Sequence, residues 1–204
     1  MSRPGFGARH PRLAALLARH QPSATGETCW MDGAMPLRVS AYTVPADLPE
    51  ELVSSVRCVV QVGELIVFCE NAGGAHPLPG GRRLAGESFA DAAAREVHEE
   101  TGWLLDRDTL RPLGWLHLEH LAPRRPDDPY PYPDLLQVVF HCTATERDGG
   151  ADVSWTDLDG YEQSSRLVSI AEARASTSND LLAPAFLDLL DDEPERAGDR
   201  PATD

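Results

Sequence analysis

The pattern of hydrophobic and polar positions divides the chain into strand-like runs joined by polar, glycine-bearing or proline-bearing connections. Residues 37–44 (LRVSAYTV) alternate between apolar and polar side chains, which is typical of a strand with one buried face. The apolar, β-branched runs 52–62 and 65–69 flank Gly63 and Glu64, a pair that favours a tight hairpin. Further strands are predicted at 110–121, 135–145 and 166–169.

One segment is predicted to form a well-defined helix. Ser88, followed three residues later by Asp91, resembles a capping box with Asp in place of Glu or Gln, so the helix should begin at Phe89. Gly102 is a natural residue to end it. Shorter helical stretches are expected at 13–17, 170–175 and 181–190, the last of them capped by Asn179 and Asp180.

Strands and helices alternate on both sides of this helix, a pattern that predicts an α/β fold, with an α/β/α sandwich around a mixed β-sheet. The length of 204 residues, 42% of them hydrophobic, fits one domain with its own core plus tails. We therefore predict an N-terminal extension with a short helix at 1–28, a single domain at 29–190 and an acidic disordered tail at 191–204.

Acidic residues gather on one face of the predicted helix. Glu96, Glu99 and Glu100 stand at i, i+3 and i+4, so their side chains share a side of the helix. Like charges this close repel, and a hard divalent cation with oxygen ligands, Mg²⁺ or Mn²⁺, would neutralise them better than Arg95 alone. The preceding Gly80 lacks a Cβ atom, so its backbone can approach the same ion and offer a carbonyl oxygen.

The segment from Gly81 to Trp103 carries a longer pattern than these acids alone. It resembles the Nudix box, G-x5-E-x7-R-E-U-x-E-E-x-G-U with U aliphatic. The matching residues are Gly81, Glu87, Arg95, Glu96, Val97, Glu99, Glu100 and Gly102, and Trp103 departs from the pattern. At average residue frequencies, a chance match anywhere along the chain is on the order of 10⁻⁶. An ordinary solvated acidic helix face, the alternative, does not require the glycines or Glu87 at their positions.

The resemblance implies a Nudix-type α/β/α sandwich and a Mg²⁺- or Mn²⁺-dependent hydrolase of a nucleoside diphosphate linked to another group. It also implies residue roles. Glu99 and Glu100, with the Gly80 carbonyl, would be the principal metal ligands, and Glu96 a further ligand or the general base. Arg95 would orient Glu96 or Glu99, and Glu87 would support the metal shell. A metal beside several carboxylates suits this chemistry, because it screens phosphate oxygens and activates a bound water.

Outside the box, several residues are weaker candidates. The proline-rich segment 122–134 is predicted to be a semi-rigid loop, in which Tyr130 and Tyr132 could stack on a base and Arg124 could contact phosphates. A surface loop that merely packs its tyrosines remains an equal alternative. Nudix enzymes often complete the metal site with a downstream carboxylate, for which Glu119 and Glu162 are the candidates, although for each of them alone an ordinary surface acid is the favoured interpretation.

The net charge and the composition restrict the classes of molecule that the protein is expected to bind. A formal net charge of −15 argues against a nucleic-acid polymer and leaves a small nucleotide-type substrate arriving with its metal. No apolar run reaches the ~20 residues of a membrane span. The four cysteines lack C-x-x-C spacing, so we expect buried reduced thiols in a cytoplasmic protein. The N-terminal helix should dock on the domain or on a second subunit, which leaves a homodimer open.

Two functional classes remain after these considerations. The first is the metal-dependent pyrophosphohydrolase that the box implies. The second is a catalytically idle Nudix-fold sensor or regulatory module that binds a nucleotide without turnover. Such modules commonly lose box carboxylates, and this chain keeps Glu96, Glu99 and Glu100, so the enzyme is favoured. The identity of the nucleoside diphosphate derivative and the choice of general base stay open.

Overall fold

The computed structural model describes residues 7–31, 33–126, 128–150, 155, 157, 160–177 and 182–190. In chain order, these residues form α1 (Pro11–Arg19), β1 (Ala24–Trp30), β2 (Met35–Tyr42), the 3₁₀ turn η1 (Glu50–Leu52), β3 (Val53–Val62), β4 (Leu65–Asn71), β5 (Gly74–His76), α2 (Phe89–Thr101), β6 (Trp103–His120), β7 (Asp134–Arg147), β8 (Glu162–Ser169), α3 (Ile170–Ser176), α4 (Ala183–Leu187) and the 3₁₀ turn η2 (Asp188–Leu190).

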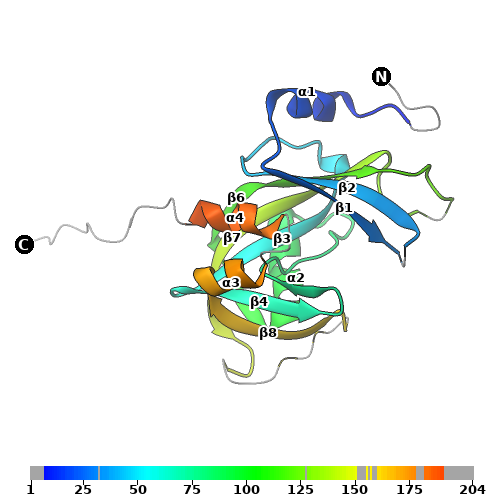
Figure 1. The fold of residues 1–204 in the computed structure, drawn as a ribbon. Helices are drawn as coiled ribbons and strands as arrows, with labels where there is room; N and C mark the ends of the chain where they lie inside the picture. The colour runs from blue at the N-terminus through cyan, green and yellow to red at the C-terminus, as the bar shows by residue number, and fades with distance from the viewer. Residues whose placement is uncertain are drawn as a thin grey trace, which may run out of the picture.

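The described strands form one eight-stranded mixed sheet (Figure 1). Seven of them follow the order β1-β2-β6-β7-β3-β4-β5, and β8 pairs with β4. The central pair β3 and β7 runs parallel, whereas β6 is antiparallel to both of its neighbours, β2 and β7. The sheet is therefore mixed, as the sequence predicted, and the protein belongs to the α/β class.

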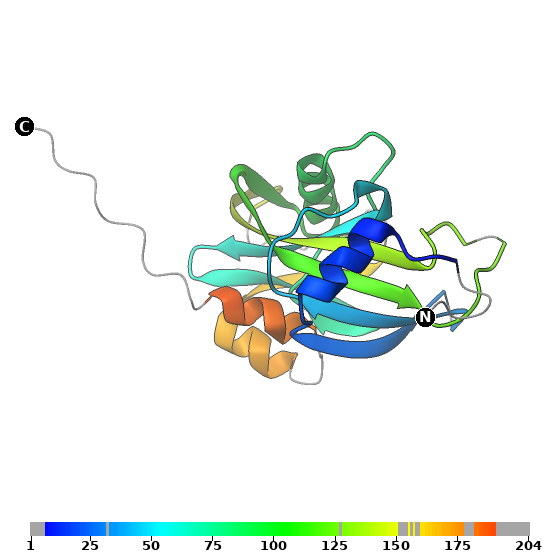
Figure 2. The ribbon, with the colours of Figure 1, turned by 90° about the horizontal axis from the view of Figure 1, so that it is seen from above.

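Helices cover both faces of the sheet. Leu13 of α1 and Val97 of α2 belong to one buried cluster, whereas Ala173 of α3 and Phe186 of α4 belong to another. Figure 2 shows α2 (green) on one side of the strands and the α3–α4 pair (orange) on the other, with α1 (dark blue) lying across the strands in front. The sheet thus lies between two helical layers, as an α/β/α sandwich requires.

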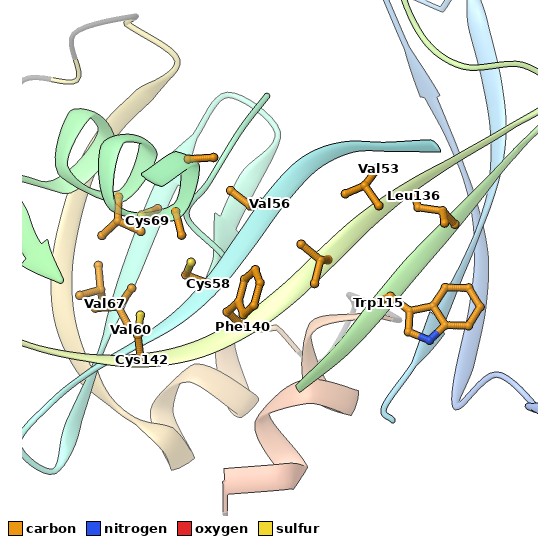
Figure 3. Packing of buried hydrophobic residues seen from close by; sticks show 14 of the residues in the cluster. Val53, Val56, Cys58, Val60, Val67, Cys69, Trp115, Leu136, Phe140 and Cys142 are labelled. Carbon is orange, nitrogen blue, oxygen red and sulfur yellow. The ribbon is translucent and has the colours of Figure 1, made fainter. Parts of the chain in front are cut away.

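The first cluster fixes α2 on the sheet. Figure 3 shows its side chains from β3, β4 and β7 gathered beneath the helix, among them Val56, Cys58, Val60, Val67, Cys69, Phe140 and Cys142. Ala92, Ala93 and Val97 of α2 are each 0% exposed within this cluster. Trp103, the departure from the Nudix box, is buried in the same cluster, so its bulk fills core volume at the start of β6. Burial of this apolar surface is the dominant force that holds α2 in place.

Several elements differ from their predicted bounds. The polar run Ala24–Trp30 forms β1 and pairs with β2 along its whole length, so the sheet begins before the predicted domain start at residue 29. β6 begins at Trp103, directly after α2, and not at residue 110. β8 begins at Glu162, four residues earlier than predicted. Pairing at the sheet edge stabilises β1 although it has no apolar pattern of its own, which explains why this strand was not predicted.

The C-terminal helix is shorter than predicted. Residues 181–190 were expected to form one helix, whereas α4 covers Ala183–Leu187 and the chain continues as the 3₁₀ turn η2. The proposed cap at Asn179 and Asp180 and the predicted tail at 191–204 lie outside the described residues.

The N-terminal helix docks on its own domain. Leu13 is 0% exposed and packs in the same cluster as α2, while ion pairs join His10 to Glu51 and Arg12 to Asp47 at 2.9 Å each. Of the two surfaces expected for this helix, the structure shows the one on the domain.

The cysteines follow the expectation in part. Cys58, Cys69 and Cys142 are buried free thiols, whereas Cys29 on β1 is exposed. Burial raises the pKa of Cys69 well above its ordinary value, which keeps this thiol protonated.

Every helix in the described ranges is shorter or more polar than a bilayer crossing requires.

Candidate active site

The segment 78–83 runs alongside β3. The Val56 N–H donates to the Gly81 carbonyl oxygen at 3.0 Å, and the Cys58 N–H donates to the Pro79 carbonyl oxygen at 2.9 Å. Gly80 has a φ of 136°, and a Cβ atom there would lie 2.3 Å from the Val56 carbonyl oxygen. Glycine is therefore required at this position, and the close approach fixes the backbone of the loop beside the sheet.

The box helix α2 is held at both ends. The Asp91 N–H donates to the Ser88 hydroxyl at 3.1 Å, which confirms the predicted cap. Gly102 is left-handed, with a φ of 75°, and a Cβ atom there would lie 2.5 Å from the Trp155 ring. The Trp155 indole N–H donates to the Glu99 carbonyl oxygen at 2.9 Å. The helix is thus a firmly anchored carrier for the side chains near its C-terminal end.

One guanidinium group binds three carboxylates of the box. Arg95 donates through Nε and Nη2 to the two oxygens of Glu87, at 2.8 and 3.0 Å. Its Nη1 donates to Glu96 and to Glu99, at 2.9 Å each. The hydrogen bond to Glu87 is the largest of the effects that raise the pKa of Arg95, and the same pairing lowers the pKa of Glu87. The structure thus brings Arg95 to both glutamates that the resemblance assigned to it.

Glu96 lies against the glycine turn. A Cβ atom on Gly81 would lie 2.3 Å from Glu96 Oε2, so the carboxylate rests directly on the glycine backbone. Glu96 is 8% exposed, and this burial raises its pKa even though Arg95 opposes the shift. Helix α2 and the loop at 80–81 therefore meet at this carboxylate.

Glu100 is the most strongly shifted acid of the box. It is 9% exposed and accepts a hydrogen bond from the Gly80 N–H at 2.7 Å. Burial raises its pKa to about 8, while the positive charge of Arg57 and the Gly80 hydrogen bond act in the opposite direction. Removal from water without full charge compensation makes the ionised form costly. A cation beside this carboxylate would stabilise its charged state. The five residues Glu87, Arg95, Glu96, Glu99 and Glu100 are called the box cluster below.

Glu96, Glu99 and Glu100 of the box cluster line a large cavity with a volume of about 770 Å³. Such a volume suits a ligand of nucleotide size. The lining comes from β1, β3, β7, the glycine loop, α2 and the segments around residues 130 and 160, and consists of Cys29, Trp30, Met31, Ser55, Arg57, Gly80, Gly81, Arg82, Glu96, Glu99, Glu100, Tyr130, Gln137, Asp157 and Tyr161.

The donor atoms for a divalent cation are present in this cavity, but they are engaged by the protein itself. Within the described ranges, no group of three His, Cys, Asp or Glu side chains is gathered closely enough to hold a metal ion. Glu96 and Glu99 bind Arg95, and the Gly80 carbonyl oxygen accepts a hydrogen bond from Arg57. Carboxylate and carbonyl oxygens are the ligands that Mg²⁺ and Mn²⁺ prefer, so the donor set fits the expected ions in its chemistry.

Glu119, one of the two downstream candidates, lies in a different cluster. Arg9 contacts both Glu119 and Asp134 at 2.9 Å, and Arg38 contacts Glu119 at 3.1 Å and the exposed Glu27 at 3.5 Å. These contacts tie the segment before α1 to β6 and β7, and Glu119 is not among the residues that line the large cavity. Arg9, Arg38, Glu119 and Asp134 are called the N-terminal cluster below.

Glu162, the other candidate, is buried at the start of β8. Its Oε1 atom accepts hydrogen bonds from Asn71 at 2.9 Å and from His76 at 3.0 Å. Its Oε2 atom is buried without a hydrogen-bond partner among the described residues. Burial opposes ionisation of Glu162, but these two hydrogen bonds outweigh it and lower its pKa. The negative charge of Glu162 contributes to the raised pKa of Glu100, which places the two acids within electrostatic reach of each other.

The three candidate residues of the proline-rich loop, Tyr130, Tyr132 and Arg124, lie in different surroundings. Tyr130 lines the large cavity. Tyr132 points elsewhere and packs its ring edge against His120, with ring centroids 5.0 Å apart. Arg124 donates to the Asp128 carbonyl oxygen at 3.1 Å and does not line the cavity. The structure therefore brings Tyr130, but neither Tyr132 nor Arg124, to the cavity that Glu96, Glu99 and Glu100 line.

Several residues of this cavity were not singled out from the sequence, among them Trp30, Arg57, Gln137 and Asp157. Arg57 and Gln137 could have been noticed, because Arg57 is the one charged residue of the run 53–62 and Gln137 interrupts the apolar residues of 135–140. Trp30 and Asp157 come from segments whose local sequence gives no such contrast.

A comparison with family models identifies a match to the NUDIX domain over residues 51–189, which is more than half of the chain. No curated protein sequence matches the chain.

Solved structures with a similar fold include three that share little sequence with the chain. A NUDIX hydrolase from Nitrosomonas europaea is 21% identical, with a TM-score of 0.49 over 69% of this chain and 87% of the other. A mutant of the Bacillus subtilis pyrophosphohydrolase BsRppH is 16% identical, with a TM-score of 0.47 over 70% and 77%. A UDP-X diphosphatase is 18% identical, with a TM-score of 0.41 over 71% and 64%. The match over residues 51–189 is the comparison that carries weight.

Proposed function

The chain belongs to the NUDIX domain family, and we propose that it is a Mg²⁺- or Mn²⁺-dependent hydrolase that cleaves the phosphoanhydride bond of a nucleoside diphosphate linked to another group. The observation that carries this proposal is the excess of carboxylate in the box cluster. Three glutamates share the single guanidinium of Arg95, and the buried Glu100 lines the same cavity as two of them, Glu96 and Glu99. This excess of negative charge favours the binding of a cation and, through that cation, of a polyanionic substrate.

Each residue of the box cluster has a proposed role in this reaction. Glu99 and Glu100 bind the metal, with Glu96 as a further ligand or as the base that takes the proton from the attacking water. Arg95 is a positioning residue, because it already holds Glu96 and Glu99 at 2.9 Å. Glu87 holds Arg95 in turn, through two hydrogen bonds. When bound, the metal would screen phosphate oxygens and lower the pKa of its water.

Two further groups extend this assignment. Glu162 is the downstream carboxylate that we propose to support the site, because its Oε2 atom is unpartnered among the described residues and its charge acts on Glu100. Arg57 lines the same cavity and donates to the Gly80 carbonyl oxygen. Its guanidinium is suited to bind a phosphate oxygen of the substrate.

A substrate panel tests the proposal directly. The protein is incubated with nucleoside triphosphates, ADP-ribose, dinucleotides and nucleotide sugars in the presence of Mg²⁺ or Mn²⁺, and release of a nucleoside monophosphate is followed by chromatography. We expect turnover of at least one member and its loss in Glu99→Gln or Glu100→Gln. Glu64→Gln, at an exposed position of the β3–β4 turn, is the matched control and should retain full activity.

The panel also separates the enzyme from the sensor. Calorimetry on the same compounds measures binding without depending on turnover. A compound that binds with no product from any panel member would overturn the catalytic proposal and support the sensor instead.

A further inference from the structure

The large cavity is lined by three aromatic side chains as well as by the glutamates of the box cluster: Trp30, Tyr130 and Tyr161. Trp30 at the end of β1 and Tyr130 in the proline-rich loop approach each other with ring centroids 5.5 Å apart and a 58° angle between the planes. Arg82 donates to the Tyr130 hydroxyl at 2.8 Å, and its guanidinium carbon lies 4.8 Å from the centroid of that ring. Two segments distant in the sequence thus contribute aromatic side chains to the lining of the cavity that holds the carboxylates, and Arg82 lies over one face of the Tyr130 ring.

A buried amide lies in the same cavity. Gln137 stands in the middle of β7, is 3% exposed and pairs in register with Ser55 of β3, which also lines the cavity. Its amide nitrogen is buried and has no hydrogen-bond partner among the described residues. Its neighbours along β7 are apolar, from Leu135 to Val139. A buried, unsatisfied amide destabilises a folded protein, and such a group in a ligand cavity points to a partner supplied by the ligand.

We propose that Gln137 is a specificity-determining residue: its amide hydrogen-bonds to the edge of the substrate's nucleobase, while the face of that base packs against Trp30 and Tyr130. This inference rests on the proposed function, since it identifies the part of the substrate that lies beyond the phosphates. Every nucleobase has a flat face for aromatic stacking and at least one hydrogen-bond acceptor for an amide N–H.

Aromatic stacking and the hydrogen bond to Gln137 would contribute differently to recognition of the base. Stacking on Trp30 and Tyr130 is tolerant of base identity, because each base has a π-face. A hydrogen bond to a buried amide is selective, because a base that lacks the matching atom leaves the amide unpaired. A sugar has no flat aromatic face, so the aromatic pair favours the base over a sugar as the occupant.

The test compares Gln137→Leu with Gln163→Leu, the same substitution at an exposed position of β8. ATP, GTP, CTP and UTP present one phosphate chain with four bases, and kcat and KM are measured for each. For Gln137→Leu, we expect KM for the preferred base to rise about tenfold, with kcat nearly unchanged and a correspondingly smaller preference among the bases. Gln163→Leu should preserve the wild-type ranking.

Thermal unfolding of the free protein supplies a second readout. Leucine replaces an unsatisfied buried amide with an apolar group of similar size, so the Tm of Gln137→Leu should equal or exceed that of the wild type. A purely structural glutamine would give the opposite result, with a lower Tm and an unchanged ranking of the bases. Either that pattern or wild-type kinetics for Gln137→Leu would overturn the inference.

Substitutions at Trp30 should affect KM in a different way from those at Gln137. Trp30→Ala should raise KM for all four nucleotides by a similar factor of about ten, whereas Trp30→Phe should retain most of the affinity. Loss of the ranking without this uniform effect would contradict stacking.

Equilibrium binding separates failure of this inference from failure of the proposed function. Calorimetry with ADP, GDP, CDP and UDP is performed on the wild type and on Gln137→Leu. If the wild type hydrolyses nothing but Gln137→Leu still loses its base preference in binding, the catalytic proposal fails and the role of Gln137 stands. If the wild type hydrolyses nucleotides and the substitution changes neither binding nor turnover, only the role of Gln137 fails.

Discussion

The box cluster and the N-terminal cluster are built from the same chemical groups but differ in charge balance. In the N-terminal cluster, Arg9 and Arg38 face Glu119 and Asp134, so two guanidinium groups serve two carboxylates that are buried or half-buried, and Arg38 also contacts the exposed Glu27. In the box cluster, Arg95 serves three carboxylates, and Glu100 is buried beside them. A cluster whose positive and negative charges balance can hold segments together without a bound ion. A cluster with an excess of carboxylates favours the binding of a cation. The predictions below use each cluster as the control for the other.

Metal dependence should give the largest difference. Chelation of divalent cations is expected to abolish turnover, and Glu100→Gln should lower kcat by about a thousandfold even with Mg²⁺ present, because one of the proposed ligands is lost. Glu119→Gln should leave kcat within about twofold of the wild type. The rate of nucleoside monophosphate release measures all three. Equal losses for the two substitutions would remove the distinction between the clusters.

Arg95→Met tests the single guanidinium of the box cluster. Three carboxylates then lose their shared partner, so activity is expected to fall by about ten- to a hundredfold. Repulsion among the freed carboxylates should also lower Tm, and Mg²⁺ should restore more of it in the variant than in the wild type. Differential scanning calorimetry with and without Mg²⁺ checks this result. If Mg²⁺ changed the Tm of neither protein, this result would contradict cation binding at the box cluster.

Asp134→Asn breaks the balanced cluster. The Asp134 side chain is 1% exposed and accepts hydrogen bonds from Arg9 and from His117. Losing the charge should lower the free energy of unfolding by about 2–3 kcal/mol, because the charged hydrogen bonds are weakened within a buried site. Urea unfolding measures the loss, and kcat should stay near that of the wild type. A large drop in kcat with unchanged stability would show that this cluster takes part in catalysis.

The contribution of Asp134 to the free energy of unfolding should depend on pH. Burial opposes ionisation of Asp134, but the hydrogen bonds from His117 and Arg9 outweigh it, so its pKa lies below the ordinary value of 3.8. Its contribution to stability is fully present above the unfolded-state pKa and is lost as the pH falls through the lower folded-state pKa. The stability difference between the wild type and Asp134→Asn should therefore be constant from neutral pH to about 5 and shrink below about 4. Unfolding curves at several pH values would contradict this if the difference shrank above pH 5.

Arg38→Ala should have the smallest effect. Its side chain is 38% exposed and pairs with Glu119, which keeps its contact with Arg9. An ion pair this accessible contributes less than about 1 kcal/mol. Urea unfolding should place the variant within that range, and a larger loss would mean that the cluster depends on both arginines.

The parts of the fold that were predictable have local causes. The box helix begins at Phe89 and ends before Gly102, as predicted, because Ser88 and Gly102 supply their own capping interactions. Strand β3 could be recognised from its β-branched, apolar run. β1 could not, because its polar side chains leave pairing with β2 as its main support.

The parts of the candidate site that were not predictable depend on neighbours across the fold. Arg57 and Gln137 become neighbours of the box cluster only through the pairing of β3 with β7 and the course of the glycine loop. Tyr130 and Tyr132 are two residues apart in one proline-rich segment, yet only Tyr130 enters the cavity. The orientation of side chains in such a segment is decided by the surface on which it lies, and the sequence alone does not specify that surface.

The pairing of β2 with β6 has a practical consequence for anyone who shortens this protein. The family match begins at residue 51, after both β1 and β2. A version expressed from that residue would lose the strand that hydrogen-bonds to β6 from Trp115 to His120, together with the Trp30 wall of the cavity. It would leave a long, apolar strand edge open to strands of other molecules, and we expect it to aggregate during purification.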